Sequence, residues 1–330
     1  MRYRPVISVG PLLLTILSLS AGPARAAVTL LLEEPYGTFG GMNPTGHAAV
    51  YLSHICAASP TSLRLCNEGE QGVVISRYHR VSHYDWIAIP LLPYLYAVDR
   101  PEEVPSSVTP EDVVTLRDSW RRAHLEQIAP DNEDGTTPAG DWTQLLGSAY
   151  DRTTYAFGIE TTAAEDEKFI EALNSHPNEP HFNLLFHNCA DFVRKAIDFY
   201  YPHAVHRSLL ADVGVMTPKQ AAKSLVSYSK SHRDLQFSTF VIPQVAGTVP
   251  RSTTVRGVLE SLVKSKRYAL PLVSVAALHP LFSGSLAFAW LEGAQFNPRR
   301  LAESSDAPQE PAAIATELER NRVVTDQPVD

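Results

Sequence analysis

A capped, one-sided helix in the second half of the chain limits the folds that it can adopt. Asn188 is a residue type favoured at a helix N-cap, and the apolar residues after it recur at helical spacing. They share one face of the predicted helix: Phe192, Val193, Ala196, Ile197 and Tyr200. A helix with one apolar face is stable against a packed core. The chain has the material for such a core, because 44% of its 330 residues are hydrophobic.

Short apolar runs between turn residues predict strands in the first half of the chain. We expect strands over residues 30–33, 47–53, 72–78, 85–89 and 155–160. We expect helices over residues 109–129, 142–150 and 162–174. An extended run over residues 182–186 leads into Asn188. This mixture predicts an α+β fold.

The first 26 residues have the features of a signal peptide. Arg2 and Arg4 precede an apolar stretch over residues 9–17, and a small-x-small cleavage site ends at Ala26. The rival interpretation is an uncleaved N-terminal anchor, for which the apolar stretch is short. We therefore expect an exported protein, periplasmic or associated with the cell envelope. Removing residues 1–26 leaves 25 basic against 36 acidic residues, so the net charge changes from −8 to −11.

The cysteine count excludes a small scaffold held by disulfides, because three thiols cannot all pair with one another. In an oxidising compartment, Cys56 and Cys66 are expected to pair, since they lie ten positions apart in a polar stretch. Cys189 is then the odd thiol. The alternative is that all three thiols are reduced and buried, because free cysteine packs as a small hydrophobic residue.

The last third of the chain divides by charge. Residues 219–267 carry nine basic and two acidic residues, and the 24 residues from Tyr268 to Leu291 carry none of either kind. That run is long enough to cross a bilayer, although its internal prolines also fit buried helices or a surface-associated hairpin. We expect residues 206–296 to form a basic and then apolar helical appendage that associates with a membrane through the uncharged run. Residues 297–330, with seven acidic and four basic groups, are expected to be a disordered tail.

Cys189 and His47 are the candidate reactive residues. Cys189 lies in the first turn of the predicted helix, where unpaired N–H groups and the helix dipole favour a thiolate and lower a cysteine pKa. His47 begins a predicted strand directly after Gly46, so its imidazole can be presented to that helix start. The two could then form an ion pair. Each also has a structural alternative, namely a buried thiol and a strand histidine bound to the backbone.

The two segments resemble the signature segments of a known superfamily. The string His-Ala-Ala-Val-Tyr-Leu from His47 and the string Asn-Cys-Ala-Asp-Phe-Val from Asn188 are similar to those of the circularly permuted papain-fold thiol hydrolases and acyltransferases. That group includes lecithin retinol acyltransferase and the permuted NlpC-type peptidases, and its histidine strand also precedes its cysteine helix. From Tyr155 to Tyr200 the chain is also similar to an uncharacterised bacterial envelope domain with an Asn-Cys helix. The resemblance covers about residues 30–205.

The resemblance implies a permuted papain-like, or NlpC-like, domain over residues 27–205, with an antiparallel sheet packed against helices and the helical appendage beyond it. It implies that Cys189 is the nucleophile. It further implies that His47 is the base that activates the thiol and later protonates the leaving group.

The resemblance also implies further residues around this pair. A third catalytic residue is expected on the next strand or just after it; His79 is preferred, with His83 and Asp85 as alternatives. An oxyanion hole would use the backbone N–H of the cysteine itself, with Asn188 or His187 as side-chain donor or site-lining residue. Asn188 has a structural alternative as the helix cap.

The expected function is that of an exported cell-envelope cysteine hydrolase or acyltransferase. Its substrate would be a peptide or lipid acyl group, held as an acyl-cysteine intermediate. The alternative is a catalytically inactive papain-fold protein with a binding or structural role. We expect no cofactor or metal, because the only histidine spacing of note, His203-x-x-His206 with Asp198, is a weak one. The net negative charge argues against general nucleic-acid binding.

Overall fold

The computed structural model describes residues 26–37, 40, 44–180, 182–264, 283, 284, 287, 291 and 296–302. Its centre is an antiparallel sheet of six strands in the order β6-β5-β2-β1-β8-β9. These strands are β1 (Ala26–Glu33), β2 (His47–Leu52), β5 (Val73–Val81), β6 (Tyr84–Pro90), β8 (Thr154–Thr161) and β9 (Ser238–Ile242). The predicted α+β class with an antiparallel sheet is therefore confirmed.

Smaller strand pairs and helices complete the fold. The strands β3 (Ile55–Ser59) and β4 (Ser62–Leu65) form a hairpin, and β7 (Ser107–Val108) pairs in parallel with β10 (Ala246–Gly247). The helices are α2 (Leu91–Tyr96), α3 (Pro110–His124), α4 (Ser148–Asp151), α5 (Ala163–Asn174), α6 (Cys189–Tyr200), α7 (Pro218–Ser231), α8 (Val258–Lys264) and α11 (Pro298–Ala302). Short 3-10 turns lie at Pro101–Glu103, Asp141–Leu145 and Arg233–Leu235.

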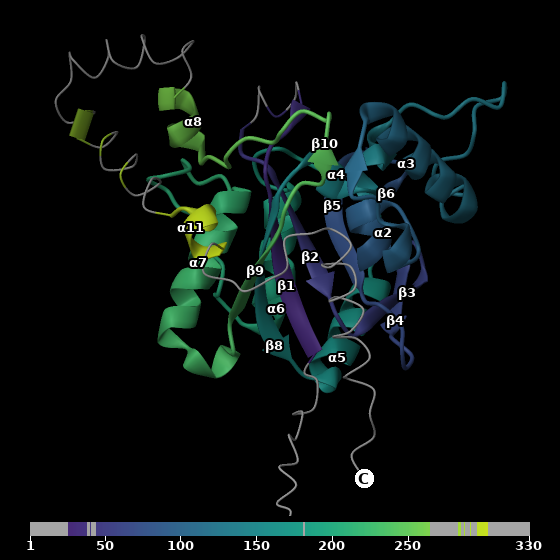
Figure 1. Ribbon diagram of the computed structural model, residues 1–330. Helices are drawn as coiled ribbons and strands as arrows, with labels where there is room; N and C mark the ends of the chain where they lie inside the picture. Colours follow the sequence, from purple (N-terminus) through teal and green to yellow (C-terminus); the bar gives the residue numbers. More distant parts are fainter. Residues whose placement is uncertain are drawn as a thin grey trace, which may run out of the picture.

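The sheet is the middle layer of three, with α7 and α11 on one side and α2 and α3 on the other (Figure 1). Side chains alternate between the two faces of a strand, so both faces of the sheet are covered. Leu30 and Ala48 belong to the core shared with α6 and α7. Leu31 and Ala49 belong to the core shared with α2 and α3. Because both faces of β1 and β2 are buried, apolar residues are needed at successive positions, and the two strands have continuous apolar runs.

The predicted helix starts agree with the structure. α3 and α5 follow Thr109 and Thr162, and each threonine forms a capping box with the acidic residue three positions later. α3 ends at His124 rather than at residue 129. The helix predicted over residues 142–150 is divided into a 3-10 turn and α4.

The segment after α6 is not a separate helical appendage, so this part of the prediction for residues 206–296 is wrong. β9 pairs with β8 and forms one edge of the central sheet. In α7, Ala222 and Leu225 are fully buried in the same core as α6. Lys230, Arg233 and Arg251 of this segment are exposed, whereas Lys219 is buried in an ion pair with Glu260, so charge alone did not show that the segment belongs to the domain. The folded domain therefore extends well beyond residue 205.

The first residues of the predicted tail form a helix. α11 lies within residues 297–330, and Arg299 donates to a carboxylate oxygen of Glu34 at 2.8 Å. Residues 303–330 lie outside the described residues. At the other end, residues 1–25 of the predicted signal peptide also lie outside them, while Ala26 already pairs with Thr161 in β1 and β8.

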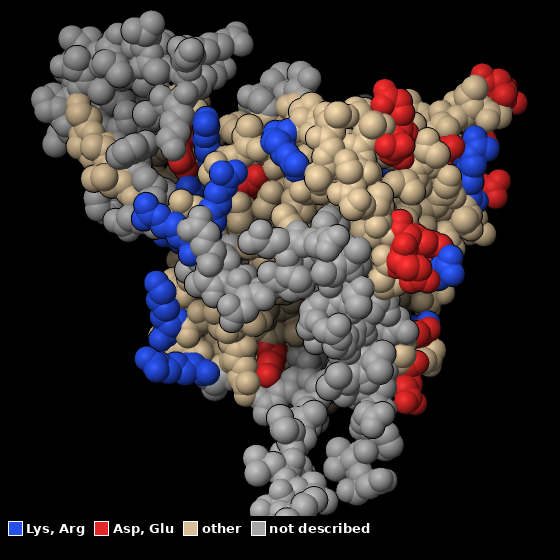
Figure 2. Space-filling view, viewed as in Figure 1, with Lys and Arg blue, Asp and Glu red and all other residues tan. Residues whose placement is uncertain are grey.

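Most of the uncharged run from Tyr268 to Leu291 lies outside the described residues, apart from positions 283, 284, 287 and 291. Within the part of the chain that the structure describes, every helix is too short or too polar to cross a bilayer. The charged side chains are unevenly distributed. Lys and Arg gather over α7, α8 and α11, and Asp and Glu gather over α3 (Figure 2).

Candidate functional site

The cysteine helix α6 begins as the sequence predicts. Asn188 caps it, since its side-chain oxygen accepts from the N–H of Asp191 at 3.0 Å. Its amide nitrogen donates to the carbonyl oxygens of Leu184 and Met216, each at 2.9 Å. These two bonds use both amide hydrogens of Asn188. Asn188 is thus a structural cap, and its side chain has no hydrogen left to donate to an oxyanion.

The Cys189 thiol is half-buried at the start of α6. Burial raises its pKa to about 11, although hydrogen bonds from the backbone amides of Ala48 and Ala190 favour the thiolate and oppose the shift. The sequence predicted the opposite direction, because a helix N-terminus lowers a cysteine pKa. Removal of the thiolate from water outweighs the helix start here. The resting side chain is therefore a neutral thiol.

His47 is held at the first position of β2 by a close approach of two backbones. Its Cα lies opposite Glu33 of β1, and Gly46 before it has a φ of +74°. A Cβ added at Gly46 would lie 2.2 Å from the carbonyl oxygen of Glu33. Glycine is thus required by both conformation and space. The sequence string Gly-His therefore fixes where the imidazole enters the site.

Ser76 of β5 defines the tautomer of the His47 ring. The Ser76 hydroxyl donates to the carbonyl oxygen of Ala48 at 2.7 Å and lies 2.9 Å from His47 Nε2. A hydroxyl has one proton to donate, so in this second contact the Ser76 oxygen accepts and Nε2 carries the hydrogen. With the ring neutral, Nδ1 then holds the lone pair. It follows that Nδ1 is the nitrogen that can act as a base.

The candidate pair lies in one small region of the molecule. Ala48, which donates to the Cys189 thiol, directly follows His47. The Tyr78 ring stacks on the His47 ring with centroids 4.8 Å apart; burial is the main cause that raises the Tyr78 pKa, and Cys189 is one of the nearby groups that contribute to the shift. The structure therefore brings these residues together. Within the described residues, the hydrogen bond of the imidazole goes to Ser76 and not to the thiol.

The pKa of His47 lies well below its ordinary value, mainly through burial and also through the nearby positive charge of Arg152. Both the imidazole of His47 and the thiol of Cys189 are therefore neutral at neutral pH. The ion pair that the sequence suggested is therefore not the resting state. Proton transfer between the two would have to accompany a reaction.

A buried ion pair lies near His47, because Glu33 is the residue opposite His47 in the pairing of β1 with β2. Arg152 and Glu33 lie 2.9 Å apart, guanidinium to carboxylate, with side chains 3% and 0% exposed. The hydroxyl of Tyr94 donates to Glu33 at 2.6 Å, and the Arg152 guanidinium lies 4.6 Å from the centre of the Tyr36 ring. Burial raises the pKa of Glu33, and Arg152 opposes that shift. This pair sets the electrostatic environment of both candidate residues.

The three residues expected as a third catalytic member lie elsewhere. His79 is exposed, and its ring packs edge-to-face on Phe182 with centroids 5.1 Å apart. His83 is exposed beside the turn between β5 and β6. Asp85 is buried and binds Arg77 through two hydrogen bonds of 2.5 Å. Ser76, which sequence reasoning missed, is the side chain that hydrogen-bonds to the His47 ring.

His187 lies at the end of a tight hairpin just before the helix. It exchanges two backbone hydrogen bonds with Asn183, of 3.1 and 2.9 Å, and its side chain is exposed. The predicted run over residues 182–186 is therefore a hairpin turn rather than a strand. The role of His187 in lining the site stays a prediction.

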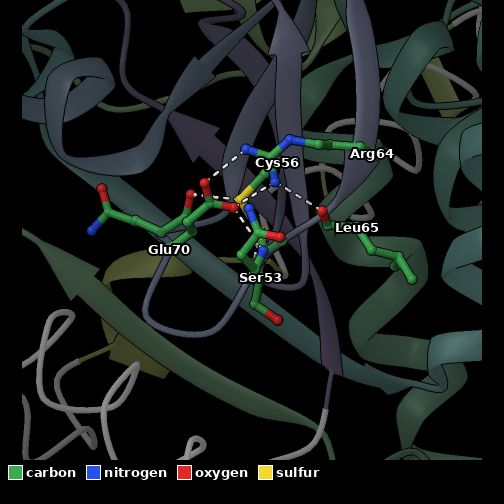
Figure 3. The surroundings of a disulfide bond; sticks show 8 residues. Ser53, Cys56, Arg64, Leu65 and Glu70 are labelled. Carbon is green, nitrogen blue, oxygen red and sulfur yellow. Dashed lines mark hydrogen bonds and ion pairs between the residues drawn. A yellow bond between two sulfur atoms is a disulfide. The ribbon is translucent and has the colours of Figure 1, made fainter.

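The predicted disulfide is confirmed (Figure 3). Cys56 in β3 is bonded to Cys66, which follows β4, at an S–S distance of 2.05 Å. The neighbouring Arg64 and Glu70 form an ion pair of 2.5 Å, and this contact lowers the pKa of Glu70 to about 2. The bond leaves Cys189 as the free thiol. A disulfide of this kind is consistent with an oxidising compartment.

Among the described residues there is no group of three or more histidine, cysteine or acidic side chains arranged to hold a metal ion. No family model, curated protein or solved structure matches this chain. The geometry around Cys189 and His47 is therefore the basis on which a function has to be argued.

Proposed function

We propose that this chain is an exported cysteine hydrolase or acyltransferase with a permuted papain-like domain. Cys189 would be the nucleophile and His47 the base. One observation carries the proposal: a half-buried thiol at a helix start accepts from the N–H of Ala48, the residue after His47, and the Nε2 of His47 is held by Ser76, so that Nδ1 remains as the base. The proposed chemistry is acyl transfer from an amide or ester, and it uses no cofactor.

In the proposed reaction, Nδ1 of His47 takes the thiol proton while the sulfur of Cys189 attacks the carbonyl carbon. The new S–C bond forms, and one electron pair of the carbonyl moves to its oxygen. N–H groups at the start of α6 would stabilise that negative charge. The imidazolium then protonates the leaving amine or alcohol, whose bond to the acyl carbon breaks. Water or another nucleophile releases the acyl group from sulfur by the same steps.

The directions of the two pKa shifts favour general-base catalysis over attack by a preformed thiolate. The thiol has a raised pKa and the imidazole a lowered one, so the neutral pair is stable before substrate arrives. Ser76 keeps the His47 imidazole in the tautomer whose Nδ1 is basic, so the ring does not have to change tautomer before it accepts the thiol proton.

A second candidate function is favoured by the same pKa shifts. A thiol with a pKa of about 11 is ionised in only about one molecule in ten thousand at pH 7. Such a thiol also suits a catalytically inactive papain-like protein with a binding or structural role in the envelope. The two candidates differ in whether Cys189 can be acylated.

The proposed substrate is a peptide or lipid acyl group of the cell envelope. Export is supported by the disulfide between Cys56 and Cys66 and by the leader-like composition of residues 1–26. Intact mass of the protein recovered from the envelope fraction tests this directly. A chain that retains residues 1–26, or that carries two reduced thiols in place of the disulfide, would contradict export.

Acylation of Cys189 tests the proposed activity. The protein is incubated with p-nitrophenyl acyl esters, and the attached acyl group is located by intact mass and peptide mapping. We expect a single acyl group on Cys189, lost in Cys189→Ser and formed at least about a hundredfold more slowly in His47→Gln. His79→Ala is the matched control, because its ring lies outside the site, and should acylate at the rate of the wild type.

Two outcomes would decide against the enzyme. One is an acylation rate no greater than that of a short cysteine peptide at the same pH. The other is an equal rate in the wild type and in His47→Gln, provided that both give the same circular dichroism spectrum. Either result would favour the inactive papain-like protein.

A further inference from the structure

A group of large apolar side chains lies exposed next to the cysteine helix. They come from two loops, residues 183–187 before α6 and residues 207–215 before α7, which we call the apolar loop pair. Their exposed fractions are 58% for Leu184, 50% for Leu185, 57% for Phe186, 80% for Leu209, 51% for Leu210 and 62% for Val213. Single exposed apolar residues are common on proteins, but six in two adjacent loops mark an interaction surface.

The two loops form one surface because they are bonded to each other. The Arg207 guanidinium lies 5.8 Å from the centre of the Phe186 ring and donates to the Phe186 carbonyl oxygen at 3.4 Å. The side-chain amide of Asn188 joins the carbonyl oxygens of Leu184 and Met216, which lie at the two loops. The backbones of the two loops are therefore joined through the side chain of the residue that caps α6.

Polar contacts fix the first loop with its apolar side chains outward. Asn183 and His187 exchange backbone hydrogen bonds across the base of the turn. The side-chain oxygen of Asn183 accepts from the N–H groups of Leu185 at 2.9 Å and Phe186 at 3.2 Å. Exposure of the apolar tip is thus a property of an ordered turn.

The second loop carries backbone strain at one of its exposed residues. Val213 has a φ of +53°, a left-handed conformation that is costly for a β-branched residue, and Gly214 after it has a φ of +78°. The Ser208 carbonyl oxygen accepts from the N–H of Gly214 at 3.0 Å and closes the turn. Strain that holds an apolar side chain in water points to a function for that side chain.

The apolar loop pair adjoins the basic part of the molecule. In the second loop, the Ala211 carbonyl oxygen accepts from Leu259 N at 3.3 Å, and the Asp212 side chain accepts from Val258 N at 2.7 Å. Both donors lie at the start of α8, one of the three helices over which Lys and Arg gather (Figure 2). Apolar side chains beside cations match the boundary of a bilayer, where acyl chains lie below headgroups that include anionic ones.

We propose that the apolar loop pair inserts into the surface of a lipid bilayer. The inserted side chains are those of Leu184, Leu185, Phe186, Leu209, Leu210 and Val213, with the basic side of the protein facing the headgroups. This binding would hold the start of α6 at the membrane surface. The proposal does not rest on catalysis by Cys189, because insertion needs only the exposed side chains.

Vesicle binding tests the proposal on the full mature chain. Wild type and variants are sedimented with phosphatidylcholine vesicles that contain phosphatidylglycerol. We expect the wild type to bind. The double variants Leu185→Ser/Phe186→Ser and Leu209→Ser/Leu210→Ser should each bind at least about tenfold more weakly. Val114→Ser is the matched control, since Val114 is 64% exposed on α3, and should bind like the wild type.

A fluorescent reporter gives a second readout that does not depend on a loss of binding. Phe186→Trp should shift its emission to shorter wavelength on addition of vesicles, measured as the difference from wild type. Val114→Trp should not shift. Thermal unfolding of each variant in the absence of vesicles confirms that it is folded.

Three results would overturn the proposal. The first is no vesicle binding by the wild type. The second is unchanged binding by both serine double variants, which would assign any membrane contact to another segment. The third is concentration-dependent self-association of wild type that is abolished by these substitutions, without any emission shift of Phe186→Trp on vesicles. That outcome would identify a second copy of the chain as the partner.

Discussion

Ser76 and His47 lie 2.9 Å apart, Oγ to Nε2, although 29 positions separate them in the chain. The Ser76 hydroxyl donates its only hydrogen to the Ala48 carbonyl oxygen. In its contact with the His47 ring, the Ser76 oxygen can therefore only accept a hydrogen bond. One serine on the neighbouring strand thereby decides which imidazole nitrogen is basic.

Ser76→Ala should therefore slow acylation of Cys189 without removing the thiol or the base. The variant loses the one hydrogen bond that selects the tautomer of His47, and its acylation rate is expected to fall about tenfold. Ser76→Thr retains the hydroxyl and should recover most of the activity. The pH dependence should also change, because the imidazole of Ser76→Ala can take either tautomer. Equal rates and pH profiles for wild type and Ser76→Ala would exclude this positioning role.

The Cys189 thiol should titrate far above neutral pH in the folded protein. Burial raises its pKa to about 11, so alkylation by iodoacetamide should still accelerate between pH 9 and pH 11. In urea, the alkylation rate of the same thiol should be half-maximal near the ordinary cysteine pKa and level off above it. A plateau below pH 8 in the folded protein would show that the helix start prevails over burial after all.

The same shift predicts a difference in stability between wild type and Cys189→Ala. The folded pKa lies above the unfolded one, so the contribution of the neutral thiol is complete below about pH 9 and is lost as pH rises towards 11. Urea unfolding should show wild type losing stability relative to Cys189→Ala across that window. A constant difference between the two proteins from pH 7 to pH 11 would contradict the raised pKa.

The ion pair of Glu33 and Arg152 should be sensitive to the loss of one partner. Both side chains are buried, so Arg152→Met leaves a buried carboxylate and should destabilise the fold by about 3–5 kcal/mol. Glu33→Gln/Arg152→Met removes both charges and should be less destabilised than Arg152→Met alone. Urea unfolding compares four proteins: wild type, Glu33→Gln, Arg152→Met and the double variant. A double variant as unstable as the sum of its two single variants would mean that the charges do not interact.

Loss of the disulfide should destabilise the fold without affecting the candidate site. The bond closes a loop with a sequence separation of 10, which corresponds to about 2–3 kcal/mol in the chain-entropy account. Cys56→Ser/Cys66→Ser should unfold at correspondingly lower urea concentration than the oxidised wild type. Wild type under reducing conditions should match this variant. Alkylation of Cys189 at neutral pH should be the same in both.

Those features that depend on local pattern were predictable from the sequence. The cap at Asn188, the apolar face of α6 and the threonine caps of α3 and α5 are set by residues within one or two turns. The disulfide was predictable because its cysteines lie only ten positions apart in a polar stretch.

Other features depend on what surrounds a residue, and the sequence does not show this. A serine in a strand is unremarkable until its neighbour across the sheet is known, so Ser76 was missed. The pKa direction of Cys189 was wrong because burial prevailed over the helix dipole. β9 was missed because its five residues lie within a basic segment, and the segment was interpreted from its charge rather than from its short apolar run.

The buried carboxylate of Glu34, at the end of β1, has a consequence for the order of folding. It accepts from the Ser252 hydroxyl at 2.6 Å and from the Arg299 guanidinium at 2.8 Å, donors that lie 218 and 265 positions later in the chain. Contacts of such long range form late and slow folding. The strand end opposite His47 is therefore completed only after Arg299 has been synthesised, so this part of the candidate site forms late in folding.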